Sequence, residues 1–142
     1  MLELAGRHAQ IVGLAARVPA PFRHDPLSCL AEATTEKLTW MRQAAGERYG
    51  DIELNTYPVL APVRVTPNAL AAARSLADQV RERDGVEIGE AALLASPHVF
   101  FGTVEQLVEK CVGLRERFGI TYIMAGGEAE AFAPVVERLA GR

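Results

Sequence analysis

The chain has 142 residues, 49 % of them hydrophobic, and its 15 basic and 18 acidic residues give a net charge of −3. This length allows one core, so we expect a single domain over 1–142. The mildly acidic balance gives no reason to expect nucleic-acid binding, and no apolar run approaches the ~20 residues that cross a bilayer. We therefore expect a cytoplasmic protein in which Cys29 and Cys111 are reduced.

The first half of the chain alternates between helical and extended patterns. Residues 1–9 resemble the end of a helix, and 10–15 form a short apolar strand. Three prolines make 16–28 a loop. Apolar residues at helical spacing then predict a helix that ends at 50, and alternation of apolar and polar residues predicts a strand over 51–60.

The second half repeats the same alternation. A proline-bracketed connection over 61–67 precedes a helix over 68–84, with a short extra helix over 89–95. Residues 99–101 are a continuous apolar run, which is typical of a buried strand. A helix follows from 104, and a last strand and helix occupy the remaining chain, which gives four strand–helix units in all.

Two helix starts carry capping signals. Thr34 or Thr35 is expected to cap the helix that ends at 50. Thr103 and Gln106 have the spacing of a capping box, directly after Gly102, which allows a tight turn at the end of the preceding strand.

Four strand–helix units fit either a small open doubly wound sheet or half of a (β/α)8 barrel. The strand over 51–60 favours the barrel, because Ile52 and Leu54 form an apolar face while Glu53, Asn55 and Tyr57 form a polar face suited to a barrel interior. We therefore expect an α/β fold that is the C-terminal half of a TIM barrel, strands five to eight. Its exposed strand edges predict a partner that completes it.

Five segments together resemble the luciferase-like monooxygenase superfamily, particularly its deazaflavin-dependent oxidoreductase branch. They are 2–14 (LELAGRHAQIVGL), 37–55 (KLTWMRQAAGERYGDIELN), 96–106 (SPHVFFGTVEQ), 115–123 (RERFGITYI) and 132–141 (FAPVVERLAG). The resemblance implies a (β/α)8 barrel that binds FMN or coenzyme F-420 at the carboxyl ends of its strands. It also implies that the first half of the barrel, with much of the cofactor pocket, is absent from this chain.

The resemblance assigns the segment that leaves strand five to the cofactor. In this sequence those residues are Gly13, Leu14, Ala15, Ala16 and Arg17. Small residues let backbone N–H groups approach a ring or a phosphate, and Arg17 can pair with the phosphate. The alternative is an ordinary strand end followed by a solvated arginine.

A second group of residues is expected at the substrate or at a phosphate. Two of these residues face the barrel interior and four form glycine turns after strands seven and eight, where barrels often bind phosphate. Their alternative roles are filling of the interior and simple turns. They are Asn55, Tyr57, Gly102, Thr103, Gly126 and Gly127.

Other candidate residues are expected to have structural roles. His24 lies in the long loop and should be exposed, and His98 should lie at the bottom of the barrel, on the face linked to stability. Trp40 and Cys111 should pack against the core. No histidine pair has the spacing of metal ligands, so no metal is expected.

Two functions remain open. The first is part of a flavin- or deazaflavin-dependent oxidoreductase with a small-molecule substrate, completed by a second copy, by a complementary N-terminal half-barrel or by a preceding segment, with catalytic residues unknown. The second is a non-catalytic half-barrel that serves as an oligomeric assembly or ligand-binding module. Binding of no cofactor by this chain alone is compatible with both.

Overall fold

The computed structural model describes residues 1–19, 23–126 and 129–141. Its helices are α1 (Leu2–His8), α2 (Ala31–Ala45), α3 (Ala69–Asp84), α4 (Glu90–Ala95), α5 (Val104–Phe118) and α6 (Ala129–Leu139), with short 3-10 turns η1 (Leu27–Cys29) and η2 (Gly46–Asp51). The strands are β1 (Ile11–Gly13), β2 (Glu53–Thr56), β3 (Arg64–Val65), β4 (Phe101–Gly102) and β5 (Ile120–Ile123). No helix in the described ranges is long and apolar enough to span a bilayer.

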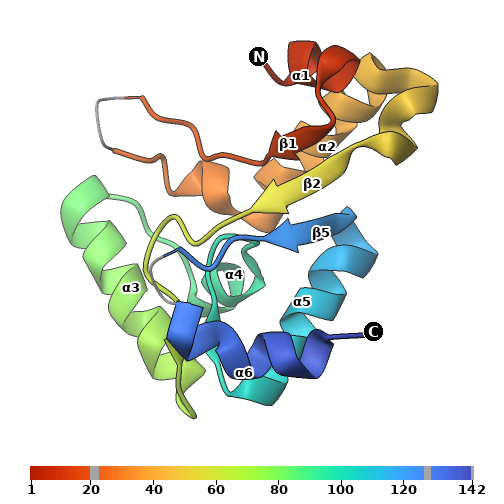
Figure 1. Ribbon diagram of the computed structural model, residues 1–142. Coiled ribbons are helices and arrows are strands. Elements are labelled where there is room, and N and C mark those ends of the chain that lie inside the picture. The colour runs from red at the N-terminus through yellow and green to blue at the C-terminus, as the bar shows by residue number, and fades with distance from the viewer. Residues whose placement is uncertain (20–22, 127–128, 142) are drawn as a thin grey trace.

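The strands form two small parallel sheets rather than half of a barrel. One sheet has the order β1-β2-β5, and the other pairs β3 with β4 (Figure 1). In a half-barrel the four predicted strands would pair in chain order, with the strand at 99–101 between β2 and β5. The predicted half-barrel is therefore wrong, and the open doubly wound sheet does not describe the fold either.

The connection after β2 is the physical reason for this difference. We expected 61–67 to be irregular, but it contains β3, whose ladder with β4 uses the bonds from Arg64 N to the Phe100 carbonyl (2.9 Å) and from Thr66 N to the Gly102 carbonyl (2.8 Å). The strand at 99–102 thus pairs with the chain just after β2 instead of with β2 itself. The edge of β2 that it leaves open is occupied by β5.

The alternation predicted for β2 is confirmed. Leu54 and Thr56 are buried, Glu53 is exposed, and Asn55 and Tyr57 are half-buried. The buried face packs on helices α2, α5 and α6 and forms the larger core, whose members include Val12, Leu14, Leu38, Met41, Leu54, Phe100, Leu107, Leu114, Phe118, Ile120, Phe132 and Val135.

A smaller core lies under α3 and α4. It consists of Ala72, Ala73, Leu76, Val80, Ile88, Leu93, Val99 and Phe101. The strand at 99–101 thus contributes to both cores, because Phe100 belongs to the larger core and its two neighbours belong to the smaller one. The predicted burial of 99–101 is confirmed, but the strand itself, β4, comprises only Phe101 and Gly102.

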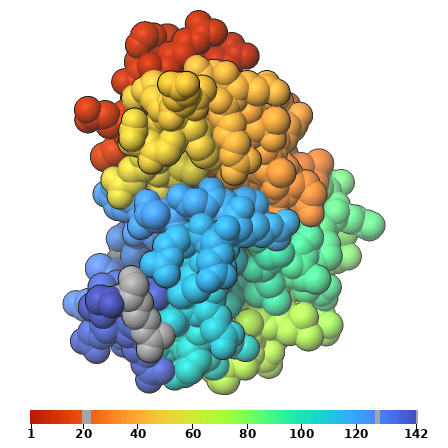
Figure 2. All heavy atoms as spheres, turned by 90° about the vertical axis from the view of Figure 1, so that its right-hand side faces the viewer, coloured from red at the N-terminus to blue at the C-terminus, as the bar shows by residue number. Residues whose placement is uncertain are grey.

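The two ends of the described chain lie far apart. In Figure 2, α1 lies at the top against α2, and α6 lies at the lower left. Helix α1 approaches α2 closely because Gly6 has no side chain: a Cβ there would be 3.1 Å from the Met41 carbonyl oxygen.

Of the two capping signals, one is confirmed. Thr103 accepts from the Gln106 amide while the Gln106 side chain accepts from the Thr103 amide, which is a complete capping box. The prediction for Thr34 and Thr35 is wrong, since α2 begins at Ala31. Both hydroxyls lie inside the helix, where they donate to carbonyls four residues back.

Gly102→Ala is expected to destabilise the fold by about 1–3 kcal/mol. Gly102 has φ +156°, and a Cβ there would lie 3.0 Å from both Cβ and Oε1 of Gln106, so it would strain the backbone and the capping box. Urea unfolding measures the loss. Gly113→Ala on α5 is the control: a Cβ there meets nothing within 4 Å, so this variant should be neutral or slightly more stable. Equal stability of the two variants would contradict the expectation.

Candidate functional site

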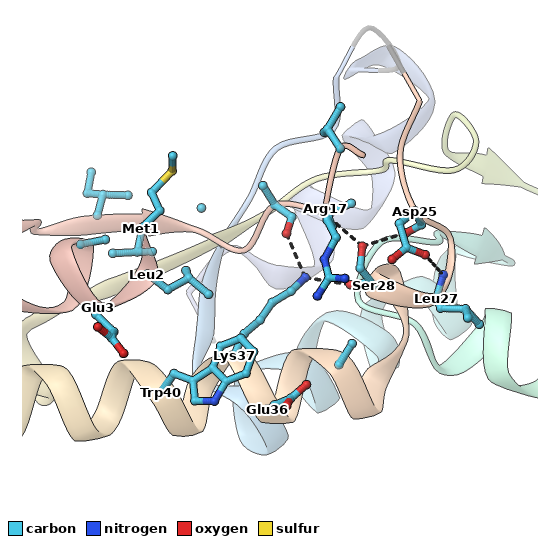
Figure 3. A pocket seen from close by; sticks show the side chains of 18 residues that line it. Met1, Leu2, Glu3, Arg17, Asp25, Leu27, Ser28, Glu36, Lys37 and Trp40 are labelled. Carbon is cyan, nitrogen blue, oxygen red and sulfur yellow. Dashed lines mark hydrogen bonds between the residues drawn. The ribbon is translucent and has the colours of Figure 1, made fainter. Parts of the chain in front are cut away.

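A large cavity lies beside β1. Its volume is about 950 Å³, and it lies between β1 with the loop that follows it, α1, and one side of α2 (Figure 3). The residues that line it are Met1, Leu2, Glu3, Ala5, Ile11, Val12, Gly13, Ala15, Ala16, Arg17, Val18, Asp25, Leu27, Ser28, Ala33, Glu36, Lys37 and Trp40.

The segment predicted to contact a cofactor forms one wall of this cavity. Gly13, Ala15, Ala16 and Arg17 line it. Leu14 does not, because its side chain is fully buried in the larger core while its amide donates to the Asn55 carbonyl (2.9 Å). Within this segment Leu14 alone turns into the core and away from the cavity.

A buried lysine fastens this wall to α2. The Nζ atom of Lys37 donates to the carbonyl oxygen of Ala15 (2.8 Å) and to that of Ser28 (2.7 Å). Burial lowers the pKa of Lys37, against the charges of Cys29 and Asp25, which raise it. One amine therefore holds together the end of β1, the turn η1 and α2.

Hydrogen bonds also join the cavity residues that come after Ala16. The Arg17 amide donates to Ser28 Oγ (2.7 Å), and Ser28 Oγ donates to the Asp25 carbonyl (2.7 Å). The Asp25 carboxylate accepts from the Leu27 amide (3.0 Å). These bonds fix the backbone of Arg17, and Figure 3 shows its side chain reaching toward Lys37.

Trp40 also belongs to the cavity, although we expected it to pack in the core. Its side chain remains 42 % exposed and lines the cavity from α2, one turn after Lys37. One signal in the sequence could have identified both Trp40 and Lys37, because each is a residue type that is rare in this chain. Trp40 is the only tryptophan, and Lys37 is one of only two lysines among 15 basic residues.

The remaining predicted site residues lie elsewhere. Asn55 and Tyr57 are half-buried on and after β2, and Asn55 Nδ2 donates to the Tyr122 carbonyl (3.2 Å). The polar groups of Thr103 are used by the capping box. Gly126 lines a second cavity of about 350 Å³ that includes neither Gly102 nor Thr103.

Neither of the two cavities described above is therefore lined by both predicted phosphate turns. Gly127 lies outside the described residues.

His98 lies beside the carboxyl end of β2, not at the opposite end as we expected. It is fully buried, and Nδ1 lies 3.0 Å from the Tyr57 carbonyl and 3.2 Å from Thr56 Oγ1. Because a carbonyl only accepts, Nδ1 carries the proton, and the buried Nε2 has no partner among the described residues. Burial lowers the pKa of His98 to about 4, so the ring is neutral near pH 7.

The described residues offer no metal site, since no three His, Cys, Asp or Glu side chains in the ranges given above converge. Cys111 is buried as expected, and both Cys29 and Cys111 are free thiols whose pKa burial raises to about 11. No protein-family model, curated protein or solved structure matches this chain.

His98 is expected to make the fold sensitive to acid. The unfolded chain takes up a proton near pH 6.5 and the folded chain only near pH 4, so stability falls as pH drops through that window. A difference of this size corresponds to about 3 kcal/mol at most. The charges of Lys37, His24 and Lys110 act on the ring in the same direction as burial.

His98→Asn keeps a donor for the Tyr57 carbonyl but does not titrate, so it should flatten the stability profile between pH 6.5 and pH 4. Urea unfolding at several pH values measures this. His8→Asn, at an exposed position on α1, is the control and should follow the parent chain. If the stability of His98→Asn still falls steeply between pH 6.5 and pH 4, the sensitivity to acid comes from other groups.

Proposed function

We propose that the cavity beside β1 binds a flavin or deazaflavin cofactor, FMN or coenzyme F-420, and that the chain is part of an oxidoreductase acting on a small-molecule substrate. One observation carries this proposal: four of the five residues that the family resemblance assigns to the cofactor line this single cavity. A cytoplasmic location belongs to the same proposal, supported by the free thiols of Cys29 and Cys111.

The residues at the cavity fit such a group. The volume of about 950 Å³ falls at the upper end of small-molecule sites, which span about 300–1,000 Å³. Trp40 offers an aromatic face for a planar ring, and Val18 and Leu27 add apolar surface elsewhere in the cavity. The guanidinium of Arg17 has no partner among the described residues and suits a phosphate.

In this proposal the protein binds and orients, while the bound cofactor supplies the redox chemistry. Arg17 holds the anionic end, because its backbone is already fixed by Ser28. Trp40 covers the ring from α2, and Lys37 keeps the wall in place through its two carbonyl contacts. Ala15 and Ala16 leave room for close approach of the ring.

A binding module without catalysis is the second candidate, and one observation favours it. The Ser28 hydroxyl and the Asp25 carboxylate, which are candidate acid–base groups at the cavity, are used by bonds within the loop itself. Cofactor reduction in a complex with substrate distinguishes the two candidates, since a binding module shows cofactor binding but no turnover.

Arg17→Gln is expected to weaken binding of FMN or coenzyme F-420 by about 10- to 100-fold, because it removes a charge-assisted bond to phosphate. Trp40→Ala should weaken it through lost ring contact. Titration followed by absorbance and fluorescence measures both. Arg7→Gln, at an exposed arginine of α1 that does not line the cavity, should bind like the parent chain.

The proposal is refuted if the parent chain binds neither cofactor in any oligomeric state, or if Arg17→Gln and Arg7→Gln bind equally. Binding of FMN with no binding of coenzyme F-420, or the reverse, identifies the cofactor.

We also propose that a second copy of the chain covers the open edge of β1. The ladder to β2 uses the Gln10 carbonyl and the Leu14 amide, so the peptide groups of Ile11 and Gly13 point away from β2. Ile11 is 54 % exposed beside them. An apolar strand edge without charge or proline is a surface that pairs readily with another strand.

Ile11→Lys is therefore expected to convert a dimer to a monomer while the chain stays folded, because a charged edge residue opposes strand pairing. Light scattering after size-exclusion chromatography gives the mass, and circular dichroism reports the fold. Leu70→Lys is the matched control, since Leu70 is also 54 % exposed but lies on α3. A monomeric parent chain would exclude this partner.

A further inference from the structure

Both lysines of this chain are placed unlike ordinary surface lysines. The other 13 basic residues are arginines, whereas Lys37 is buried and Lys110 is half-buried. Each amine donates to two backbone carbonyls, and the ion pairs found among the described residues include neither. Without a carboxylate partner, loss of the proton breaks no ion pair at either amine.

The contacts of Lys37 allow it to act as a neutral amine. A neutral amine keeps two hydrogens and one lone pair, and the carbonyls of Ala15 and Ser28 accept the two hydrogens at 2.8 and 2.7 Å. The lone pair must then point away from both carbonyls. Burial lowers the pKa of Lys37 and the charge of Arg17 adds to this, while the charges of Cys29 and Asp25 oppose it.

The cavity gives a ligand access to this amine. Lys37 lines the cavity of about 950 Å³ together with Arg17, whose charge acts on the Lys37 amine (Figure 3). A cation beside the amine suits a ligand that carries an anionic group close to its reactive carbon. Lysines in such settings form Schiff bases with carbonyl compounds.

We propose that Lys37 is a nucleophile that forms an imine with a small aldehyde or ketone bearing a carboxylate or phosphate, which Arg17 holds. The nitrogen lone pair attacks the carbonyl carbon and a C–N bond forms. The two amine hydrogens leave with the carbonyl oxygen as water, so the step requires no oxidant or reductant. The proposal does not rest on cofactor binding, and the two have separate readouts.

Lys110 is an internal control within the same chain. Its amine donates to the carbonyls of Leu94 and Ser96 and lies 5.7 Å from the centre of the Phe100 ring. Burial lowers the pKa of Lys110 to about 8, yet Lys110 lines neither of the two described cavities. If a lowered pKa were sufficient for imine formation, Lys110 would react. If access to the cavity is required, only Lys37 reacts.

The test traps the imine on the full chain. The protein is incubated with glyoxylate or with glycolaldehyde phosphate in the presence of cyanoborohydride, and the adduct is located by peptide mass mapping. We expect at least about tenfold more adduct on Lys37 than on Lys110, because only Lys37 lines a cavity that can hold the probe beside its amine. Preference for one of the two probes identifies the anionic group as carboxylate or phosphate.

Variants distinguish a reaction that depends on the cavity from general reactivity of lysines toward the probe. Lys37→Arg keeps donors for both carbonyls and should lose the adduct, whereas Lys110→Arg should keep it. Arg17→Gln should lower the yield with the charged probes but not with propionaldehyde, which has no anionic group. Equal labelling of Lys37 and Lys110, or label confined to the N-terminal amine, overturns the proposal. This comparison is made within the parent chain, so it stands even if a variant fails to fold.

Discussion

The cavity beside β1 depends on one buried amine that bridges two backbone carbonyls. Lys37 on α2 donates to Ala15 just after β1 and to Ser28 in η1, which are 13 residues apart in the chain. Hydrogen bonds from a charged donor contribute about 1.5–3 kcal/mol each, and carbonyls left without a donor when buried carry a comparable penalty. This side chain therefore fixes the chain at Ala15 and at Ser28, and Arg17 lies two residues beyond the first of these points, where its amide donates to Ser28 Oγ.

A second polar network explains why the sheet is built as it is. Thr56 at the end of β2 donates to the Pro97 carbonyl, and Ser96 donates to the Cys29 carbonyl at 2.6 Å. His98 is anchored to Tyr57 in the same region. These bonds hold the residues before β4 at the carboxyl end of β2, so β4 begins beyond β2 rather than alongside it. Helix α5 then brings β5 back to the free edge of β2.

Local patterns in the sequence predicted the elements well where the deciding interactions lie within a few residues. The capping box of Thr103 and Gln106 and the two faces of β2 follow from spacing alone. Thr34 misled the prediction, because a threonine cap and a threonine bonded back to Leu30 inside a buried first turn have the same local sequence. Trp40 misled the prediction for a different reason. Whether a helix residue is exposed depends on which other elements pack against that helix.

Local patterns in the sequence could not predict which strands pair or where the cavity forms. The pairing of β2 with β5 joins residues more than 60 positions apart, and the short strand β3 has no periodicity that identifies it. The segment of Gly13 to Arg17 was singled out only by its resemblance to a family. Its place at a cavity with Lys37 and Trp40 required the folded arrangement of α1, β1 and α2.

The sequence by itself therefore determined the kind, order and approximate bounds of the helices and the main strands, and which face of β2 is buried. These follow from propensity, capping and periodicity, which act over one or two turns or pleats. Only the tertiary structure decided that β5 lies beside β2, that β4 lies beside β3, and that Arg17, Lys37 and Trp40 meet at one cavity. Backbone hydrogen bonds between distant segments decide those features, and every strand offers the same donors and acceptors whatever its sequence.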